Sequence, residues 1–264
     1  MPVTSVRDLE LYYELHGPPR APCLLLVHGL GSSARDWEHQ IEALAARYRV
    51  LAVDLRAHGR SSRRGPITMA GLAGDLAALL RMLELAQVHV VGISLGAGVA
   101  FQLAVDHPAL VAGVIVINGG PEGPSTANPE HRAGIAWRIE TVQQLGMHGL
   151  GAQLADRLFP DARFAPTREA FVERWVRNDA AFYLETFEAI IDWSVRHRLA
   201  TLAVPCGVIT GDRDYTPVAY KREYASELRD AEVVVIEQSG HMTTHDQPAA
   251  LNAAILGFVD RWSA

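Results

Sequence analysis

The chain has 264 residues, of which 49% are hydrophobic and 20% charged, and its formal net charge is −6. This length and composition are typical of a globular protein with one large core. The acidic balance argues against a nucleic-acid-binding surface, which would be basic. The two cysteines, Cys23 and Cys206, lie in or beside apolar runs, and we expect small buried side chains there rather than a disulfide or metal ligands.

Targeting and membrane segments are not expected either. The chain opens Met-Pro-Val-Thr, without the basic and apolar regions of a signal peptide. The most apolar stretch, Val88–Val105, is interrupted by His89, Ser94 and Gln102 and by three glycines, which is unlike a membrane span. The sequence therefore predicts a soluble cytoplasmic protein with neither membrane nor nucleic-acid partners, and it leaves a homo-oligomer open.

The first half of the chain alternates between two hydrophobic periods. β-rich runs predict strands at Leu9–Leu15, Leu24–Val27, Val50–Val53, Val88–Ile93 and Val111–Ile117. Leucines between Leu72 and Leu83 recur at helical spacing, and Gln40–Ala46 is a shorter helical pattern. Near-continuous apolar strands separated by helices indicate a parallel sheet that is covered on both faces.

After Asn118 the alternation stops. A Gly- and Pro-rich linker precedes a helical region, Pro129–Arg198, which is broken at Gly146–Gly151 and by two prolines. Thr167 and Asp179 are the expected N-caps of two of its helices. Nine of the 19 aromatic residues fall between Pro121 and Ala200. This composition suggests a helical cap over a site, although rings that simply pack the cap would give the same pattern.

The β/α pattern then resumes to the end of the chain. Strands are expected at Pro205–Thr210 and Glu232–Ile236, and helices at Val218–Leu228 and Gln247–Trp262. The predicted organisation is an α/β core domain of residues 1–120 and 201–264. A helical cap of residues 121–200 is inserted after the sixth strand of its mostly parallel central sheet.

Ser94 is the candidate nucleophile. It stands at the centre of Gly92-Ile93-Ser94-Leu95-Gly96, which fits the G-x-S-x-G elbow. The predicted strand Val88–Ile93 leads into this motif, and a helical stretch, Val99–Asp106, leaves it. A sharp turn of this kind holds the hydroxyl out above the sheet, and the helix N-terminus favours an oxyanion beside it. The alternative, a chance Gly/Ser turn, does not account for this context.

A serine hydroxyl needs a base, and His241 is the candidate. It follows the strand Val233–Ile236 by a short loop, and His245 lies four residues further on. The pair resembles a zinc-binding helix but lacks the glutamate of H-E-x-x-H. We therefore expect His245 to be peripheral, and we expect neither a metal nor an organic cofactor.

Two further parts of the site are less sharply defined. The carboxylate that would orient His241 is Asp212 or Asp214, in Gly211-Asp212-Arg213-Asp214, and spacing alone does not choose between them. An oxyanion hole needs two backbone N–H donors. Leu95, after the nucleophile, is one candidate, and Leu30, in the glycine-rich turn after Leu24–Val27, is the other.

These residues together resemble the serine-nucleophile branch of the α/β-hydrolase superfamily, and the resemblance covers almost the whole chain. Four motifs that occur in family order carry it: His28-Gly29-Leu30-Gly31, the turn Asp54–Ser61, the Ser94 elbow, and Gly240-His241 followed by Asp246 and Pro248. In the second motif, Ala57 stands where the family usually has glycine. Trp37 also lies where these enzymes often carry a tryptophan.

The resemblance narrows the site and the chemistry. The family's acid usually stands three residues after the glycine with a proline nearby, which selects Asp214 and leaves Asp212 as the alternative. Dehalogenases and epoxide hydrolases of this fold carry aspartate at the nucleophile position, so Ser94 argues against both. The remaining relatives include carboxylesterases, enol-lactonases of the 3-oxoadipate type, carbon–carbon bond hydrolases and perhydrolases, and the chain most resembles the lactonase and esterase group.

The expected function is hydrolysis of a small carboxylic ester or lactone by Ser94, His241 and Asp214. Carbon–carbon bond hydrolysis or perhydrolysis would use the same residues, and a non-catalytic binding protein of this fold can also keep them. The residues expected to contact the substrate are Gly29, Trp37, Trp137, Tyr215 and Met242. The cap residues Trp175, Phe182 and Trp193 are weaker candidates, and plain packing explains any of these side chains as well.

Overall fold

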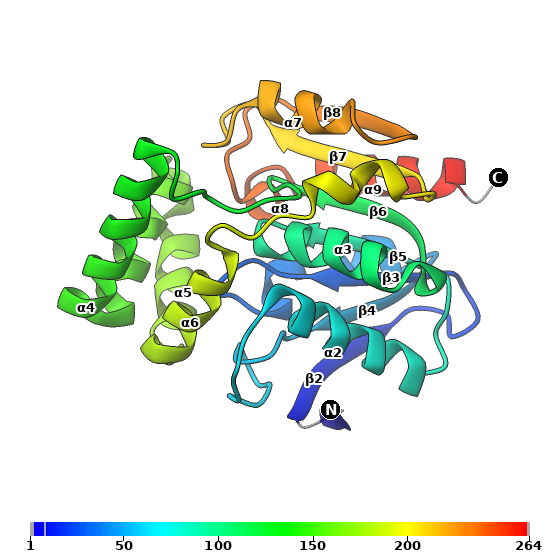
Figure 1. The fold of residues 1–264 in the computed structure, drawn as a ribbon, viewed down its shortest axis with the longest axis horizontal. Coiled ribbons are helices and arrows are strands. Elements are labelled where there is room, and N and C mark those ends of the chain that lie inside the picture. The colour runs from blue at the N-terminus through cyan, green and yellow to red at the C-terminus, as the bar shows by residue number, and fades with distance from the viewer. Residues whose placement is uncertain (1–2, 8, 263–264) are drawn as a thin grey trace.

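A computed structural model describes residues 3–7 and 9–262 and places a twisted eight-stranded sheet at the centre of the molecule (Figure 1). The strands are β1 (Val3–Val6), β2 (Leu9–His16), β3 (Cys23–Val27), β4 (Arg49–Val53), β5 (Val88–Ile93), β6 (Val111–Ile117), β7 (Cys206–Gly211) and β8 (Ala231–Ile236). Their order is β1-β2-β4-β3-β5-β6-β7-β8. The pairs β1–β2 and β2–β4 are antiparallel and the other five pairs are parallel, which confirms the predicted mostly parallel sheet.

The strands are apolar on both faces because each face is covered by helices. In β3, Leu25 and Val27 belong to one buried cluster, and Leu24 and Leu26 belong to the cluster on the opposite face. Successive side chains of a strand point to opposite faces. This alternation explains why the strands appear in the sequence as continuous hydrophobic runs.

Helices on the two faces of the sheet complete these clusters. One face carries α2 (Met69–Met82), α3 (Leu95–Asp106) and α7 (Val218–Ala225). The other carries α1 (Ile41–Ala45) and α9 (Pro248–Trp262), which follows the short α8 (Thr243–Asp246). Both cysteines are buried and free, as expected.

The cap helices α4 (Pro129–Leu158), α5 (Ala165–Trp175) and α6 (Ala180–Ile190) lie together beside the sheet (Figure 1). They follow β6 and share a buried cluster of their own. Asp179 caps α6 as predicted, accepting from the amide of Ala181 at 2.9 Å. The prediction for Thr167 was wrong, because α5 begins two residues earlier, at Ala165. Gly146, with φ of 65°, breaks the path of α4 where the sequence predicted an interruption.

Among residues 3–7 and 9–262, no helix is both long enough and apolar enough to span a membrane.

Candidate functional site

Ser94 occupies a strained turn between β5 and α3. Its φ of 56° and ψ of −115° lie outside the conformations that non-glycine residues favour. The Ser94 amide donates to the carbonyl of Ile117 at 2.9 Å, which ties the turn to β6. A Cβ on residue 92 would lie 2.1 Å from the carbonyl oxygen of Gly96. The sharp turn is therefore sterically possible only with glycine at position 92.

Gly96→Ala should prevent this turn from closing. A Cβ at Gly96 would lie 2.1 Å from the carbonyl oxygen of Val27, a backbone atom that cannot move aside cheaply. We expect a loss of at least about 3 kcal/mol in the free energy of unfolding, measured by urea denaturation. The control is Gly134→Ala in α4, where a Cβ meets nothing within 4 Å, and this change should leave stability unchanged or raise it slightly. Equal stability of the two variants would contradict the account of the turn.

His241 and Asp214 meet at the carboxyl ends of β7 and β8. His241 Nδ1 donates to Asp214 Oδ1 at 2.7 Å, and both side chains are buried. Because the carboxylate only accepts, this contact leaves Nε2 of a neutral ring as the proton acceptor. Asp212 lies elsewhere: its Oδ1 accepts from the amide of Ser239 at 3.0 Å. Of the two carboxylates left open by spacing, Asp214 is the one beside His241.

Lys221 holds the other oxygen of Asp214. It is the only lysine of the sequence, its side chain is 0% exposed, and its Nζ lies 2.5 Å from Asp214 Oδ2. Burial alone would raise the pKa of Asp214, but the hydrogen bond and charge of His241, with the charge of Lys221, lower it to about 2. Asp214 is therefore an ionised carboxylate shared by a base and a buried cation.

Asn118 joins the loops that carry these groups. Its Nδ2 donates to the carbonyls of Gly240 at 3.0 Å and His241 at 2.8 Å, and its Oδ1 accepts from the amide of Gly211 at 2.9 Å. Asp246, from the family's closing motif, accepts from the amide of Gly240 at 2.6 Å. These contacts fix the backbone on both sides of the Asp214–His241 pair.

The turn after β3 lies against the Ser94 elbow. A Cβ on Gly29 would be 3.6 Å from Ser94 Cβ, and the Gly29 amide donates to Asp36 Oδ2 at 3.3 Å. Within residues 3–7 and 9–262, the amides of Leu30 and Leu95 have no hydrogen-bond acceptor. Two unpaired N–H groups beside a serine are the donors that an oxyanion hole requires.

Tyr215 lies over His241. The two rings are stacked with centroids 4.2 Å apart, and the Tyr215 hydroxyl is 2.8 Å from His241 Nε2. The same hydroxyl also interacts with the Ser94 side chain. The atom that would accept the proton of Ser94 is therefore occupied by a phenol in this conformation.

A small cavity of about 60 Å³ lies above these groups, between the sheet and the cap helices. Of the predicted substrate-binding residues, Gly29, Tyr215 and Met242 line it, as does Trp175 among the weaker candidates. Cap residues Leu154, Leu158 and Phe171 complete much of its wall. The cavity is smaller than the roughly 300–1,000 Å³ of common ligand pockets, so a substrate requires a side chain or the cap to move.

Two of the predicted substrate-binding residues lie away from the cavity, and the structure corrects them. Trp37 is 0% exposed and packs in the core on the face of α1 and α9. Trp137 packs against the cap cluster, with the guanidinium of Arg157 4.9 Å from its ring centre. Phe182 and Trp193, the remaining weaker candidates, pack against the main core instead.

Sequence reasoning missed three residues of the site: Asn118, Arg138 and Lys221. Arg138 lines the cavity and is the immediate neighbour of the predicted Trp137. Lys221 carried a usable signal, since it is the only lysine in the chain and lies seven residues after Asp214. Asn118, with φ of 48°, stands at the end of a predicted strand, where polar residues often serve a site.

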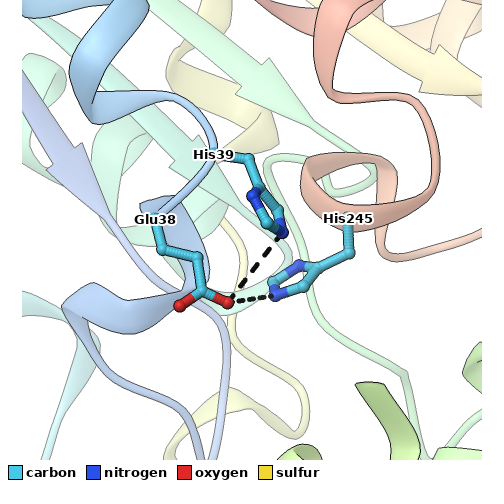
Figure 2. A group of neighbouring side chains, drawn as sticks. All are labelled: Glu38, His39 and His245. Atoms are coloured by element: carbon cyan, nitrogen blue, oxygen red, sulfur yellow. Dashed lines mark ion pairs between the residues drawn. The ribbon is translucent and has the colours of Figure 1, made fainter. Parts of the chain in front are cut away.

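His245 belongs to a separate group outside the cavity lining. Figure 2 shows Glu38, His39 and His245 turned toward one another, with Glu38 Oε1 3.6 Å from His245 Nε2 and 3.9 Å from His39 Nε2. Their donor atoms all lie within 4.8 Å, which is wider than the roughly 3.3 Å between ligands of a tetrahedral zinc ion. The neighbouring His245, opposed by burial and aided by the charge of Arg174, lowers the pKa of Glu38. These residues could hold a small cation only after closing together, and Arg174 already supplies positive charge beside Glu38.

Comparison with known proteins gives a consistent result over the whole chain. The model of the alpha/beta hydrolase family matches residues 24–254. A protein of Caulobacter vibrioides, provisionally named a carbamate hydrolase, is 29% identical over 95% of both chains. The 3-oxoadipate enol-lactonase 1 of Acinetobacter baylyi is 25% identical over 97% of this chain and 96% of its own.

Solved structures show the same likeness in three dimensions. The enol-lactonase of Burkholderia xenovorans LB400 superposes with a TM-score of 0.90 at 27% identity, covering 98% of this chain and all of that one. A thermophilic esterase of Thermogutta terrifontis gives 0.86 at 26% identity, over 99% and 98% of the two chains. Both superpositions extend over nearly the whole of this chain.

Proposed function

Because the chain belongs to the α/β hydrolase family, we propose that it hydrolyses small carboxylic esters or lactones through an acyl-enzyme on Ser94. The observation that carries this proposal is the 2.7 Å contact between His241 Nδ1 and Asp214 on loops beside the strained Ser94. The names of the relatives support the substrate class, since an enol-lactonase and an esterase are among them.

The roles of the residues follow from their atoms. The Ser94 oxygen attacks the substrate carbonyl while His241 Nε2 takes its proton, and the amides of Leu30 and Leu95 stabilise the oxyanion. The C–O bond then breaks, and His241 returns that proton to the leaving oxygen. Water attacks the acyl-enzyme, gives a proton to His241, and the second collapse restores the Ser94 hydroxyl. Asp214 orients His241 and stabilises its charged form throughout.

Tyr215 must move before this sequence can start. Its hydroxyl holds His241 Nε2 at 2.8 Å, and the residue is 64% exposed, so it can swing away without opening the core. Tyr215→Phe removes one hydrogen bond that competes with Ser94. We expect kcat/KM for a small ester to rise several-fold, up to about 10-fold for a bond of 1 kcal/mol or slightly more.

The test of the Tyr215 prediction is steady-state kinetics of the variant beside Tyr220→Phe as a control. Tyr220 lies five residues later, on α7, and it is not part of the cavity wall. A fall in kcat/KM for Tyr215→Phe alone would contradict this role and would indicate that the phenol takes part in the reaction.

The proposed function itself is tested by stopped-flow hydrolysis of p-nitrophenyl acetate and of a small lactone. An acyl-enzyme predicts a burst of p-nitrophenol close to one equivalent per chain, followed by a slower steady state. Failure of the protein to hydrolyse either esters or lactones would reject the proposal. Turnover of a dienone alone would instead assign the same residues to carbon–carbon bond hydrolysis.

A further inference from the structure

Among the described residues that line the cavity, which include Ser94 and His241, Arg138 is the one with a permanent positive charge. It comes from α4 of the cap, so it faces the catalytic loops from the opposite side of the cavity. A guanidinium stays charged at all accessible pH values. A charge in this position acts on any substrate that reaches Ser94.

The partners of Arg138 among the described residues are neutral. Its Nη1 donates to the Tyr183 hydroxyl at 2.5 Å, and its guanidinium carbon lies 5.1 Å from the ring centre of Phe187. These two contacts hold the side chain in place. They use one of its five N–H donors and leave its charge uncompensated.

The carboxylates near Arg138 form contacts with other residues. In the part of the chain that the structure describes, no Asp or Glu oxygen lies within 4.0 Å of the Arg138 guanidinium. Asp36, in the same cavity wall, accepts from the amide of Gly29 and from the hydroxyl of Ser32. Asp214 is shared by His241 and Lys221. Arg138 is half-buried. A guanidinium that is partly withdrawn from water without a counter-ion is costly, so its place in the cavity wall calls for an anionic ligand.

We propose that Arg138 binds a carboxylate of the substrate, which places the substrate among small esters or lactones that carry a free carboxylate beyond the scissile carbonyl. This inference rests on the proposed function of Ser94. An Arg–carboxylate pair forms two parallel hydrogen bonds, and the contacts to Tyr183 and Phe187 orient the fork in advance. The carboxylate would anchor one end of the substrate while its carbonyl reaches Ser94.

The test compares two p-nitrophenyl esters that differ in one group: the monoester of glutarate and the ester of its neutral terminal amide. Wild type should prefer the carboxylate ester by about 100-fold in kcat/KM, because a site built for a charged partner rejects the analogue that lacks it. Arg138→Gln should abolish most of this ratio, and Arg138→Lys should retain part of it. Arg157→Gln, exposed on the same helix and over Trp137, should keep the wild-type ratio.

A binding measurement separates this inference from the proposed function. Calorimetric titration with glutarate should show binding to wild type and at least 10-fold weaker binding to Arg138→Gln, whether or not Ser94 reacts. Equal use of the two esters, or glutarate binding that Arg138→Gln leaves unchanged, would overturn the carboxylate site. Failure of every ester to react, with glutarate binding still dependent on Arg138, would overturn the proposed function alone.

Discussion

Ser94→Ala should lower kcat for a p-nitrophenyl ester by about 10⁴-fold or more while the protein remains folded. In the proposed mechanism no neighbour can replace the attacking oxygen of Ser94, since His241 and the amides of Leu30 and Leu95 only assist the attack. Removing the hydroxyl leaves the backbone turn intact, although alanine must still adopt the φ of 56° found at this position. Activity should therefore be lost with a small change in stability.

The measurement combines ester turnover with labelling by a fluorophosphonate, which reacts with activated serines. The control is Ser226→Ala, an exposed serine at the end of α7 whose hydroxyl donates to the carbonyl of Glu223. Labelling should vanish in Ser94→Ala and persist in Ser226→Ala. Residual labelling or turnover above about 1% of wild type in Ser94→Ala would mean that another residue carries the reaction.

Lys221→Met should destabilise the protein by about 3 kcal/mol or more, because removing one partner of a buried ion pair strands the other. Both side chains of the Lys221–Asp214 pair are 0% exposed. The matched control is Arg222→Met, the next residue of α7, which is exposed and should change stability by no more than about 0.5 kcal/mol. Urea unfolding of the two variants measures the difference, and a Lys221→Met protein as stable as wild type would refute the role given to the pair.

Because Asp214 is held ionised, the free energy of unfolding of the protein should depend on pH. The pKa of Asp214 is about 2 in the folded chain and 3.8 ordinarily. A lowered folded-state pKa stabilises the protein above pH 4, and this stabilisation disappears as the pH falls toward 2. Between pH 5 and pH 2, wild type should lose about 2 kcal/mol more than Asp214→Asn. Parallel curves for the two proteins would show that the carboxylate is not held ionised in this way.

Most of the fold could be predicted because its strands are buried on both faces. The predicted Val88–Ile93 and Val111–Ile117 match β5 and β6 residue for residue. β1 was missed, since only one of its four residues is buried and they form no apolar run. Ala57, which replaces a family glycine, adopts φ of 64°, so a turn that needs a left-handed residue is kept here at some cost in strain.

Candidate site residues could be predicted where the order of the strands determines their position. They could not be predicted where the direction of a side chain determines whether it reaches the cavity. Ser94, Asp214 and His241 follow the carboxyl ends of the parallel strands β5, β7 and β8, so they lie at one edge of the sheet. Trp137 and Arg138 are adjacent in the largely exposed first part of α4, and only the structure shows that Arg138 lines the cavity. Trp37 is a further case, because a ring beside a loop can enter the core as readily as a pocket.

The most direct test of the account is mass spectrometry of the protein quenched during reaction with p-nitrophenyl acetate. Digestion and fragmentation would locate the transferred acetyl group within the chain. Acetylation of Ser94 should build up during the burst and decay with turnover, and it should be absent when His241 is replaced by Ala. Hydrolysis with no acetylated residue, or with the acetyl group on a side chain other than Ser94, would contradict it.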